Sequence, residues 1–216
     1  MLYLISIIGE QLTNSSLELR RKIAKEAASL LYFGNEKEFK QAKQKAAKIL
    51  NCKFLPTNLE VAMELDGIAE ENEGSARTER LIQMRKEALK MMKILEAYNP
   101  ILVGSVWRGT NRHESDIDIA VYYDEPNEIL SALEKVDYKV VRTEWKTVTK
   151  KGQKKSSFHV HLDSSTREEI EIVARGSEEL YRKERCEIYG DEITGLNLKK
   201  LEKVLEENPA RRFLPV

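Results

Sequence analysis

Two aspartates placed two positions apart are the residues of this sequence best suited to do chemistry. Asp116 and Asp118 begin a stretch in which acidic and apolar residues alternate, which is the pattern of a strand. Side chains two positions apart in a strand point to the same face, so we expect the two carboxylates to project together. Oxygen ligands of this kind suit Mg²⁺ or Mn²⁺. The pair therefore predicts a divalent-metal site that faces a polyphosphate.

A glycine-serine turn and two arginines favour this interpretation over that of an ordinary half-exposed strand. Gly104 and Ser105 follow an apolar run, and a glycine turn lets phosphates approach backbone N–H groups with no side chain in the way. Arg108 and Arg112 lie between the turn and the aspartates, and a guanidinium can pair with two phosphate oxygens. We expect these four residues to bind a nucleoside triphosphate.

Together these residues resemble the signature of the DNA polymerase beta-like nucleotidyltransferase superfamily. The resemblance is carried by Val103-Gly104-Ser105, by Arg108-Gly109-Thr110, which is similar to the minimal members of the superfamily, and by Ser115-Asp116-Ile117-Asp118-Ile119. It is close over residues 101 to about 123 and looser to about 175. It implies an enzyme that moves a nucleoside monophosphate from a nucleoside triphosphate to an acceptor hydroxyl and releases pyrophosphate.

The resemblance also implies a third carboxylate on a later strand. Glu171 lies between two isoleucines and is the candidate, with Glu169, of the same parity, as the fallback. Asp116 and Asp118 would then hold the metal on the nucleotide phosphates, and Asp118 and Glu171 would share a second metal. Glu171 is also the candidate general base. The superfamily more often has aspartate at this place, so the glutamate changes the expected metal geometry.

Charge along the chain offers a hint about the acceptor. Residues 17 to 53 contain ten basic and four acidic residues, and residues 60 to 79 reverse this balance. The basic segment is either an RNA-contacting surface or the solvated face of helices. The acceptor is therefore RNA, a protein side chain or a small molecule, with a slight preference for RNA. The alternatives are a non-catalytic or antitoxin-like binding module that acts on a protein partner, and an antibiotic-modifying transferase with an acidic pocket at Glu60 to Glu79.

Several other classes of protein are disfavoured by composition. The chain has 216 residues, with 36 basic and 36 acidic side chains, so no net positive charge indicates nucleic-acid binding. The apolar run from Leu2 to Ile8 is much shorter than a membrane-spanning helix and is expected to be a strand or a frayed first turn of helix. Cys52 and Cys186 are too few and too far apart for a zinc motif or a disulfide framework. We expect a cytoplasmic protein that binds neither membrane nor zinc.

Periodicity predicts an α+β fold, in which a mixed β-sheet is backed by helices on one side, with an N-terminal helical domain and C-terminal helices. The resemblance implies that this sheet is a nucleotidyltransferase core. The expected boundaries are 1–98 for the helical region, 99–175 for the core, and 176–216 for the C-terminal helical segment and tail. The helical region is expected to break at Gly74, and Asn35 is expected to cap its second helix. Strands are expected at 101–104, 116–123, 138–149, 156–162 and around Glu171, and helices at 127–135 and within 177–207.

Three further features near the expected core are candidates for a function. His159 and His161 share one face of a predicted strand, and no metal is expected there because no third nitrogen or sulfur ligand accompanies them. His113 lies between the glycine-serine turn and Asp116, where it could contact a phosphate or an acceptor. The lysine-rich turn at 150–155 is either a nucleic-acid contact or a hairpin tip whose charges discourage edge pairing.

Overall fold

A computed structural model describes residues 2–134, 138–150, 153–163 and 168–215 of the chain. It divides into two compact units, Met1–Gly74 with Glu187–Gly190, and Ser75–Cys186 with Asp191–Val216. We describe each unit by itself. The three-part division at residues 98 and 175 stays a prediction.

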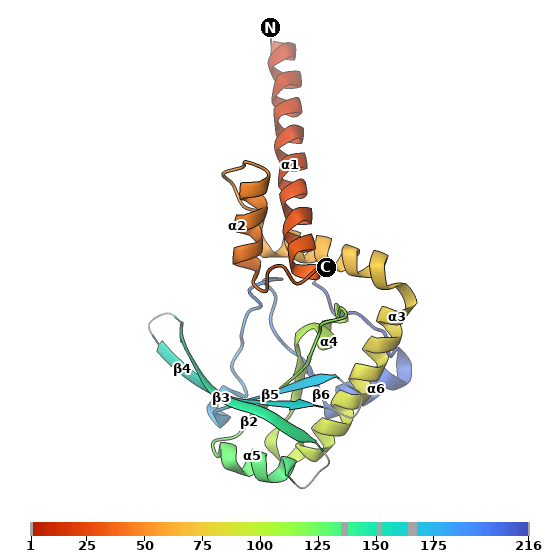
Figure 1. Cartoon of the computed structure of the whole chain (residues 1–216), viewed down its shortest axis with the longest axis vertical. Coiled ribbons are helices and arrows are strands. Elements are labelled where there is room, and N and C mark those ends of the chain that lie inside the picture. The colour runs from red at the N-terminus through yellow and green to blue at the C-terminus, as the bar shows by residue number, and fades with distance from the viewer. Residues whose placement is uncertain (1, 135–137, 151–152, 164–167, 216) are drawn as a thin grey trace. The chain divides into compact units, whose positions relative to one another are not determined.

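The first unit consists of helices packed through small side chains. Helix α1 spans Leu2–Tyr32, α2 spans Phe39–Ile49, and α1 and α2 lie side by side (Figure 1). Alanines at the contact allow the helices to approach closely, and larger aliphatic residues fill the remaining space. The buried set includes Ile23, Ala24, Ala27, Ala28, Leu31, Ala42, Ala46, Ala47, Val61, Ile68 and Ala69.

Two predicted helix starts in this unit need correction. Helix α2 begins after Glu38, which occupies the N-cap position without a side-chain cap, so the expected cap at Asn35 is wrong. The backbone at Gly34 is left-handed, with φ of 70°, and the chain runs several more residues before it can turn into the new helix. The segment Leu2 to Ile8 forms the start of α1, so of its two expected structures, a strand and a frayed first turn of helix, the strand is wrong and the helix start is confirmed.

Helix α3 spans Asn58–Ile94 and contains the predicted break. Gly74 has φ of 51° and ψ of −133°, which are not helical values, and the expected break there is confirmed. The helix starts with a capping box, in which the Glu60 N–H donates to Thr57 Oγ1 (3.1 Å) and the Thr57 N–H donates to Glu60 Oε2 (2.6 Å). Arg20 also donates to Glu60, so one carboxylate both caps α3 and ties it to α1.

The second unit is built on a six-stranded mixed sheet with the strand order β3-β4-β5-β2-β1-β6. Strands β2 and β5 are parallel, and the other neighbours are antiparallel. The predicted α+β class with a mixed sheet backed by helices is confirmed. The strands are β1 Ile101–Val103, β2 Ile117–Tyr122, β3 Lys139–Lys150, β4 Gln153–Asp163, β5 Glu169–Arg175 and β6 Leu196–Asn197.

One face of this sheet carries the core and the other carries the polar residues. The part of α3 after Gly74, α4 (Gly104–Arg108), α5 (Pro126–Leu133) and α6 (Leu198–Glu207) all contribute to one hydrophobic cluster (Figure 1). The strands contribute alternate residues to the same cluster, as the period of two requires. These residues are Leu102, Ile117, Ile119, Val121, Phe158, Val160, Leu162, Ile170, Ile172, Ala174 and Leu196.

The C-terminal segment differs in part from expectation. Only a single 3₁₀ turn, Ser177–Glu179, follows β5, so the helix expected around Leu180, Tyr181 and Ile188 is wrong. Helices in proteins are stabilised mainly by packing of an apolar face. Tyr181 is 90% exposed, so it does not contribute to such a face. The last helix, α6, forms as expected, and Asn197 Oδ1 accepts a hydrogen bond from the Lys200 N–H at its start.

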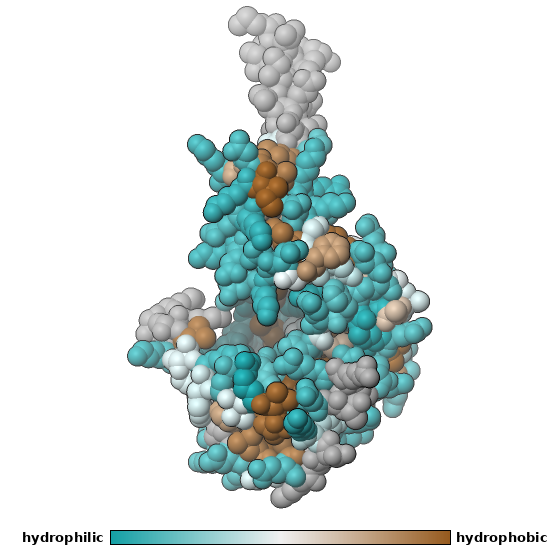
Figure 2. All heavy atoms as spheres, in the orientation of Figure 1, coloured by the Kyte–Doolittle hydropathy of each residue, from teal (hydrophilic) through white to brown (hydrophobic). Residues whose placement is uncertain are grey.

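The face seen in Figure 2 is mostly hydrophilic, with apolar side chains gathered in a few small groups. Among the described residues, no helix has both the length and the apolar character that crossing a membrane requires.

Glu60 offers a test of the helical unit. The hydrogen bond from Arg20 is the largest influence on this carboxyl, and with the bonds from Thr57 it lowers the pKa from 4.5 to about 2 against the opposing effect of burial. A lowered folded-state pKa stabilises the fold above the unfolded value and loses that contribution as the pH falls through about 4.5 toward 2. We expect Glu60→Gln to lower the free energy of unfolding by about 1 kcal/mol at neutral pH, a modest value because the pair is partly exposed. Urea denaturation followed by circular dichroism measures it.

The matched control for this prediction is Glu71→Gln, at an exposed position on the same helix. It should leave the free energy of unfolding nearly unchanged at every pH. A Glu60→Gln effect that stays constant as the pH is lowered would contradict the assigned pKa shift.

Candidate metal centre

The sheet brings the three predicted acids together. Strands β2 and β5 run in parallel with Asp118 directly opposite Glu171, and Asp116 immediately precedes β2. One carboxylate oxygen from each residue lies within 4.8 Å of the others, and all three side chains are half-buried. These acids come from two segments distant in the sequence and form a group that could hold a divalent metal ion. The structure does not identify that metal.

Gly104 lies against this group because β1 pairs with β2. Val103 is opposite Asp118, and the chain turns at Gly104 with φ of 71° into the short helix α4. A Cβ atom at position 104 would lie 1.9 Å from Asp118 Oδ2 and 2.8 Å from its Cγ. Glycine is therefore required both by the left-handed backbone and by the close approach of the carboxylate.

The three acids repel one another electrostatically. Burial is the largest cause that raises the pKa of Asp118 well above its usual value, and the negative charges of Asp116 and Glu171 raise it further. Burial also raises the pKa of Asp116, where the charges of Glu171 and Glu169 act in the same direction. A bound cation would relieve both effects, since it neutralises charge in a region with little access to water. The donor set thus fits a hard divalent ion.

Glu171 is held as a carboxylate by two neighbours that sequence reasoning did not include in the site. Burial alone would raise its pKa, but hydrogen bonds from His159 (Nδ1 to Oε1, 2.7 Å) and Lys146 (Nζ to Oε1, 3.1 Å) outweigh it, and the pKa is lowered. Both neighbours share the face of Glu171 on adjacent strands, β4 and β3. The parity of each strand was visible in the sequence, but the pairing that aligns them was not.

The other predicted strand residues form a second polar group beside the acids. His161 lies opposite Glu171 on β4, and its Nδ1 is 3.2 Å from Glu169 Oε1. Arg142 Nη2 lies 3.0 Å from His161 Nε2 and 3.1 Å from Glu144 Oε1. The fallback acid Glu169 therefore contacts His161 and is absent from the three-carboxylate group. Cations and imidazoles surround the side of the acids formed by β3 and β4.

The residues predicted to bind phosphate lie in different surroundings. Arg108 is buried, and its guanidinium donates to both oxygens of Asp191, at 2.7 and 3.1 Å, and to the Phe213 carbonyl at 3.1 Å. Arg112 is half-buried and close enough to Asp116 for its charge to lower that residue's pKa. Its Nε is buried and has no hydrogen-bond partner within the described residues. Phosphate binding by Gly104, Ser105, Arg108 and Arg112 stays a prediction.

Two buried arginines of α3 donate hydrogen bonds to backbone carbonyls in residues 106–111, the segment that follows the glycine turn. Arg85 is fully buried and donates to the carbonyls of Val106 and Trp107 at the end of α4, and to carbonyls of the C-terminal tail. Arg77 Nε donates to the Asn111 carbonyl at 2.7 Å. Such positions are hard to recognise in a sequence, because arginine in a charged helix usually faces solvent.

The charge of the basic segment of the helical unit is partly neutralised. Within the described residues, Arg20 and Arg21 pair with Glu60 and Glu64, so the acidic segment that follows compensates part of it. Three more of its ten basic residues, Lys22, Lys43 and Lys45, contact Glu18, Asn58 and Glu36. The charge reversal along the sequence therefore has a structural explanation in helix packing.

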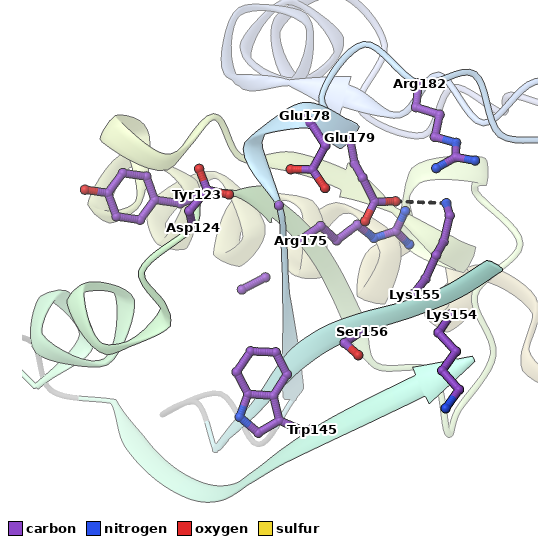
Figure 3. A pocket seen from close by; sticks show the side chains of 12 residues that line it. Tyr123, Asp124, Trp145, Lys154, Lys155, Ser156, Arg175, Glu178, Glu179 and Arg182 are labelled. Carbon is purple, nitrogen blue, oxygen red and sulfur yellow. Dashed lines mark hydrogen bonds and ion pairs between the residues drawn. The ribbon is translucent and has the colours of Figure 1, made fainter. Parts of the chain in front are cut away.

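The lysine-rich turn borders a cavity of about 560 Å³ at the carboxyl ends of β2 and β5 (Figure 3). Trp145, 62% exposed, and Lys154 line it, together with Lys155, which donates to Glu179 Oε2 at 2.9 Å. The three acids lie toward the beginning of the same two strands. Residues 151 and 152 of the predicted turn lie outside the described part of the chain.

One protein-family model matches part of the chain. A family described as "Domain of unknown function (DUF4269)" matches residues 85–183, a little under half of the chain. A search of curated proteins finds no match.

Solved structures show partial likeness. One is a cytoplasmic RNA terminal U-transferase, with 17% identity and a TM-score of 0.28 over 54% of this chain and 34% of that chain. Others are the GLD-2/RNP-8 complex, with 14% identity and a TM-score of 0.32 over 57% and 44%, and the non-canonical poly(A) polymerase complex of GLD-2 and GLD-3, with 13%, 0.31, 56% and 41%. The match spans less than half the length of each of those chains. Likeness at these TM-scores is too loose to assign an activity.

Gly104→Ala tests the close approach of the turn to the acids. The added Cβ would displace the Asp118 carboxylate, and we expect the affinity for Mn²⁺ to fall at least about tenfold while the fold is retained. Isothermal titration calorimetry measures the affinity. Gly190→Ala is the matched control, since Gly190 has a similar φ of 76° and nothing within 4 Å of an added Cβ. Equal affinity in wild type and Gly104→Ala would contradict the arrangement.

Metal binding should depend on pH. The pKa of Asp118 is raised, mainly by burial, so below that pKa a metal must displace a proton to bind. We expect the affinity for Mn²⁺ to fall as the pH is lowered from about 8 to about 5, a range in which an ordinary aspartate stays ionised. Calorimetry in buffers of different ionisation enthalpy measures the protons released. A constant affinity over this range would show that Asp118 titrates normally.

Proposed function

We propose that this chain is a metal-dependent nucleotidyltransferase that moves a nucleoside monophosphate from a nucleoside triphosphate to an acceptor hydroxyl, with release of pyrophosphate. The observation that carries the proposal is the meeting of Asp116, Asp118 and Glu171 within 4.8 Å beside the glycine turn. The DNA polymerase beta-like resemblance of the motif supplies the reaction type.

Each residue has a role that follows from its position. Asp116 and Asp118 project beside the Gly104-Ser105 turn, and we assign them to the divalent ion on the nucleotide phosphates. Asp118 and Glu171 lie opposite each other and would hold a second ion near the acceptor. Mg²⁺ or Mn²⁺ bound there supplies charge neutralisation at the attacking and leaving oxygens. Positioning and charge then account for most of the catalysis.

The phosphate side of the site is assigned to the backbone at Gly104, the Ser105 hydroxyl and Arg112. Gly104 leaves its backbone open toward the acids, and a side chain there would close that space. The buried Arg112 Nε, without a partner among the described residues, suits a phosphate oxygen that would supply the missing acceptor. We assign Arg108 to holding α4 against the C-terminal tail, through its bonds to Asp191 and Phe213.

The acceptor is the open part of the proposal. We place RNA first among the candidates, because within the described residues the side chains of the basic segment include five lysines without a hydrogen bond or ion pair: Lys25, Lys37, Lys40, Lys48 and Lys53. A hydroxyl on a protein side chain is the second candidate. Incubation with labelled nucleoside triphosphates and either total RNA or a protein extract distinguishes the two by the fraction that takes up label.

Asp118→Asn tests the proposed activity directly. The amide keeps the size of the side chain but removes the charge, and we expect Mg²⁺-dependent pyrophosphate release to fall by about a thousandfold or more. Thermal stability should be unchanged or higher, since the raised pKa shows that the ionised form is unfavourable in the folded protein. Asp163→Asn, at an exposed position at the end of β4, is the control that should keep full activity. Undiminished turnover in both Asp116→Asn and Asp118→Asn would remove the enzymatic interpretation.

A further inference from the structure

A serine on β4 is joined to Glu171 through a histidine. Ser157 Oγ lies 2.8 Å from His159 Nε2, and His159 Nδ1 lies 2.7 Å from Glu171 Oε1. Ser157 and His159 are two positions apart on one strand and therefore share the face of the sheet that carries the acids. A hydroxyl, an imidazole and a carboxylate thus follow one another at hydrogen-bonding distance.

The order of these groups determines the tautomer of His159. An ionised carboxylate only accepts hydrogen bonds, so His159 Nδ1 carries the proton that it shares with Glu171. Nε2 of a neutral imidazole then holds a lone pair and accepts from the Ser157 hydroxyl. His159 is largely buried, and its ring is held at both nitrogens. Ser157 is half-buried, so its oxygen is not sealed off from solvent.

This geometry is that of an activated nucleophile. A nucleophile and a base within about 2.6–3.2 Å, with the base oriented by a third group, mark a side chain prepared for attack on an electrophile. Glu171 belongs at the same time to the three-carboxylate group, where the triphosphate would be bound. The serine is therefore linked by two hydrogen bonds to the proposed site of nucleotide binding.

We infer that Ser157 is an internal acceptor, so that the chain transfers a nucleoside monophosphate to itself. This inference rests on the proposed function, which supplies the nucleoside triphosphate. The Ser157 oxygen forms a bond to the α-phosphorus while the bond from that phosphorus to the bridging oxygen breaks. Pyrophosphate leaves with the electron pair, and the hydroxyl proton moves to His159 Nε2. The product is a phosphodiester between Ser157 and the nucleoside.

The neighbouring serine provides a matched control. Ser156 lies on the opposite face of β4, is exposed, and its Oγ is 2.9 Å from Thr147 Oγ1. It has no imidazole partner among the described residues. The two serines thus differ in their access to His159 although they are neighbours on the same strand.

Intact-mass measurement and peptide mapping of the full chain, incubated with Mg²⁺ and each nucleoside triphosphate, test the inference. We expect one nucleoside monophosphate on Ser157 in wild type and Ser156→Ala, and none in Ser157→Ala or Asp118→Asn. His159→Asn should reduce the labelling at least about a hundredfold, the usual effect of losing a general base. Wild-type protein that releases pyrophosphate but carries no nucleotide on Ser157 would overturn the internal acceptor and leave the proposed function standing.

A second measurement separates the serine from the nucleotide site. A fluorophosphonate probe, which needs neither metal nor nucleotide, should label Ser157 in wild type, Ser156→Ala and Asp118→Asn, and should fail in Ser157→Ala and His159→Asn. If no triphosphate is turned over, the proposed function fails, and labelling by the probe still supports an activated serine. Equal probe labelling of Ser157 in wild type and His159→Asn overturns the activation by His159.

Discussion

Mutual repulsion among three carboxylates is the constraint on which the second unit depends. Two unit charges at about 4 Å interact by about 4 kcal/mol at the effective dielectric of a partly buried site, so Asp116, Asp118 and Glu171 cannot stay within 4.8 Å without structural support. A hydrogen bond from His159 and the charge of Lys146 stabilise the Glu171 carboxylate, and the charge of Arg112 partly offsets that of Asp116. Asp118, between them, keeps the most strongly raised pKa. The arrangement costs stability, which is characteristic of functional sites.

The two faces of the sheet differ in a way that holds the three carboxylates in place. Alternate residues of β2, β4 and β5 enter one apolar cluster with four helices, and this cluster fixes the strands. The residues between them point to the other face and carry the acids, the histidines and Lys146. Arg85 donates hydrogen bonds to carbonyls of α4 and of the C-terminal tail. These bonds fix the start of α4, where Gly104 lies closely against Asp118. Chemistry on one face thus rests on packing on the other.

Much of this arrangement could be predicted because strand periodicity is strictly two. The spacing of Asp116 and Asp118 and the position of Glu171 between isoleucines placed each acid on the polar face of its strand, and the sheet brings the three together. The break at Gly74 was equally visible, since glycine interrupts a helical pattern at low cost.

The remainder depends on tertiary pairing, which no local pattern contains. His159 and Lys146 join Glu171 only because β3, β4 and β5 align in one register. Arg108 pairs with Asp191, which comes from far along the chain, and no local pattern predicts that pair. The helix expected after β5 failed because a few apolar residues at plausible intervals have nothing to pack against, as the exposed Tyr181 shows.

The position of β5 in the sheet has a consequence for how the protein assembles. β5 lies between β4 and β2 in the sheet. It therefore joins the hairpin of β3 and β4 to the pair of β1 and β2, which comes earlier in the sequence. A chain in which β5 has not yet paired with β2 has Asp116 and Asp118 in place but lacks Glu171 beside them. A divalent ion held by residues of both β2 and β5 would bind with full affinity only after β5 has paired with β2. Its affinity would therefore measure whether β5 has docked in the sheet.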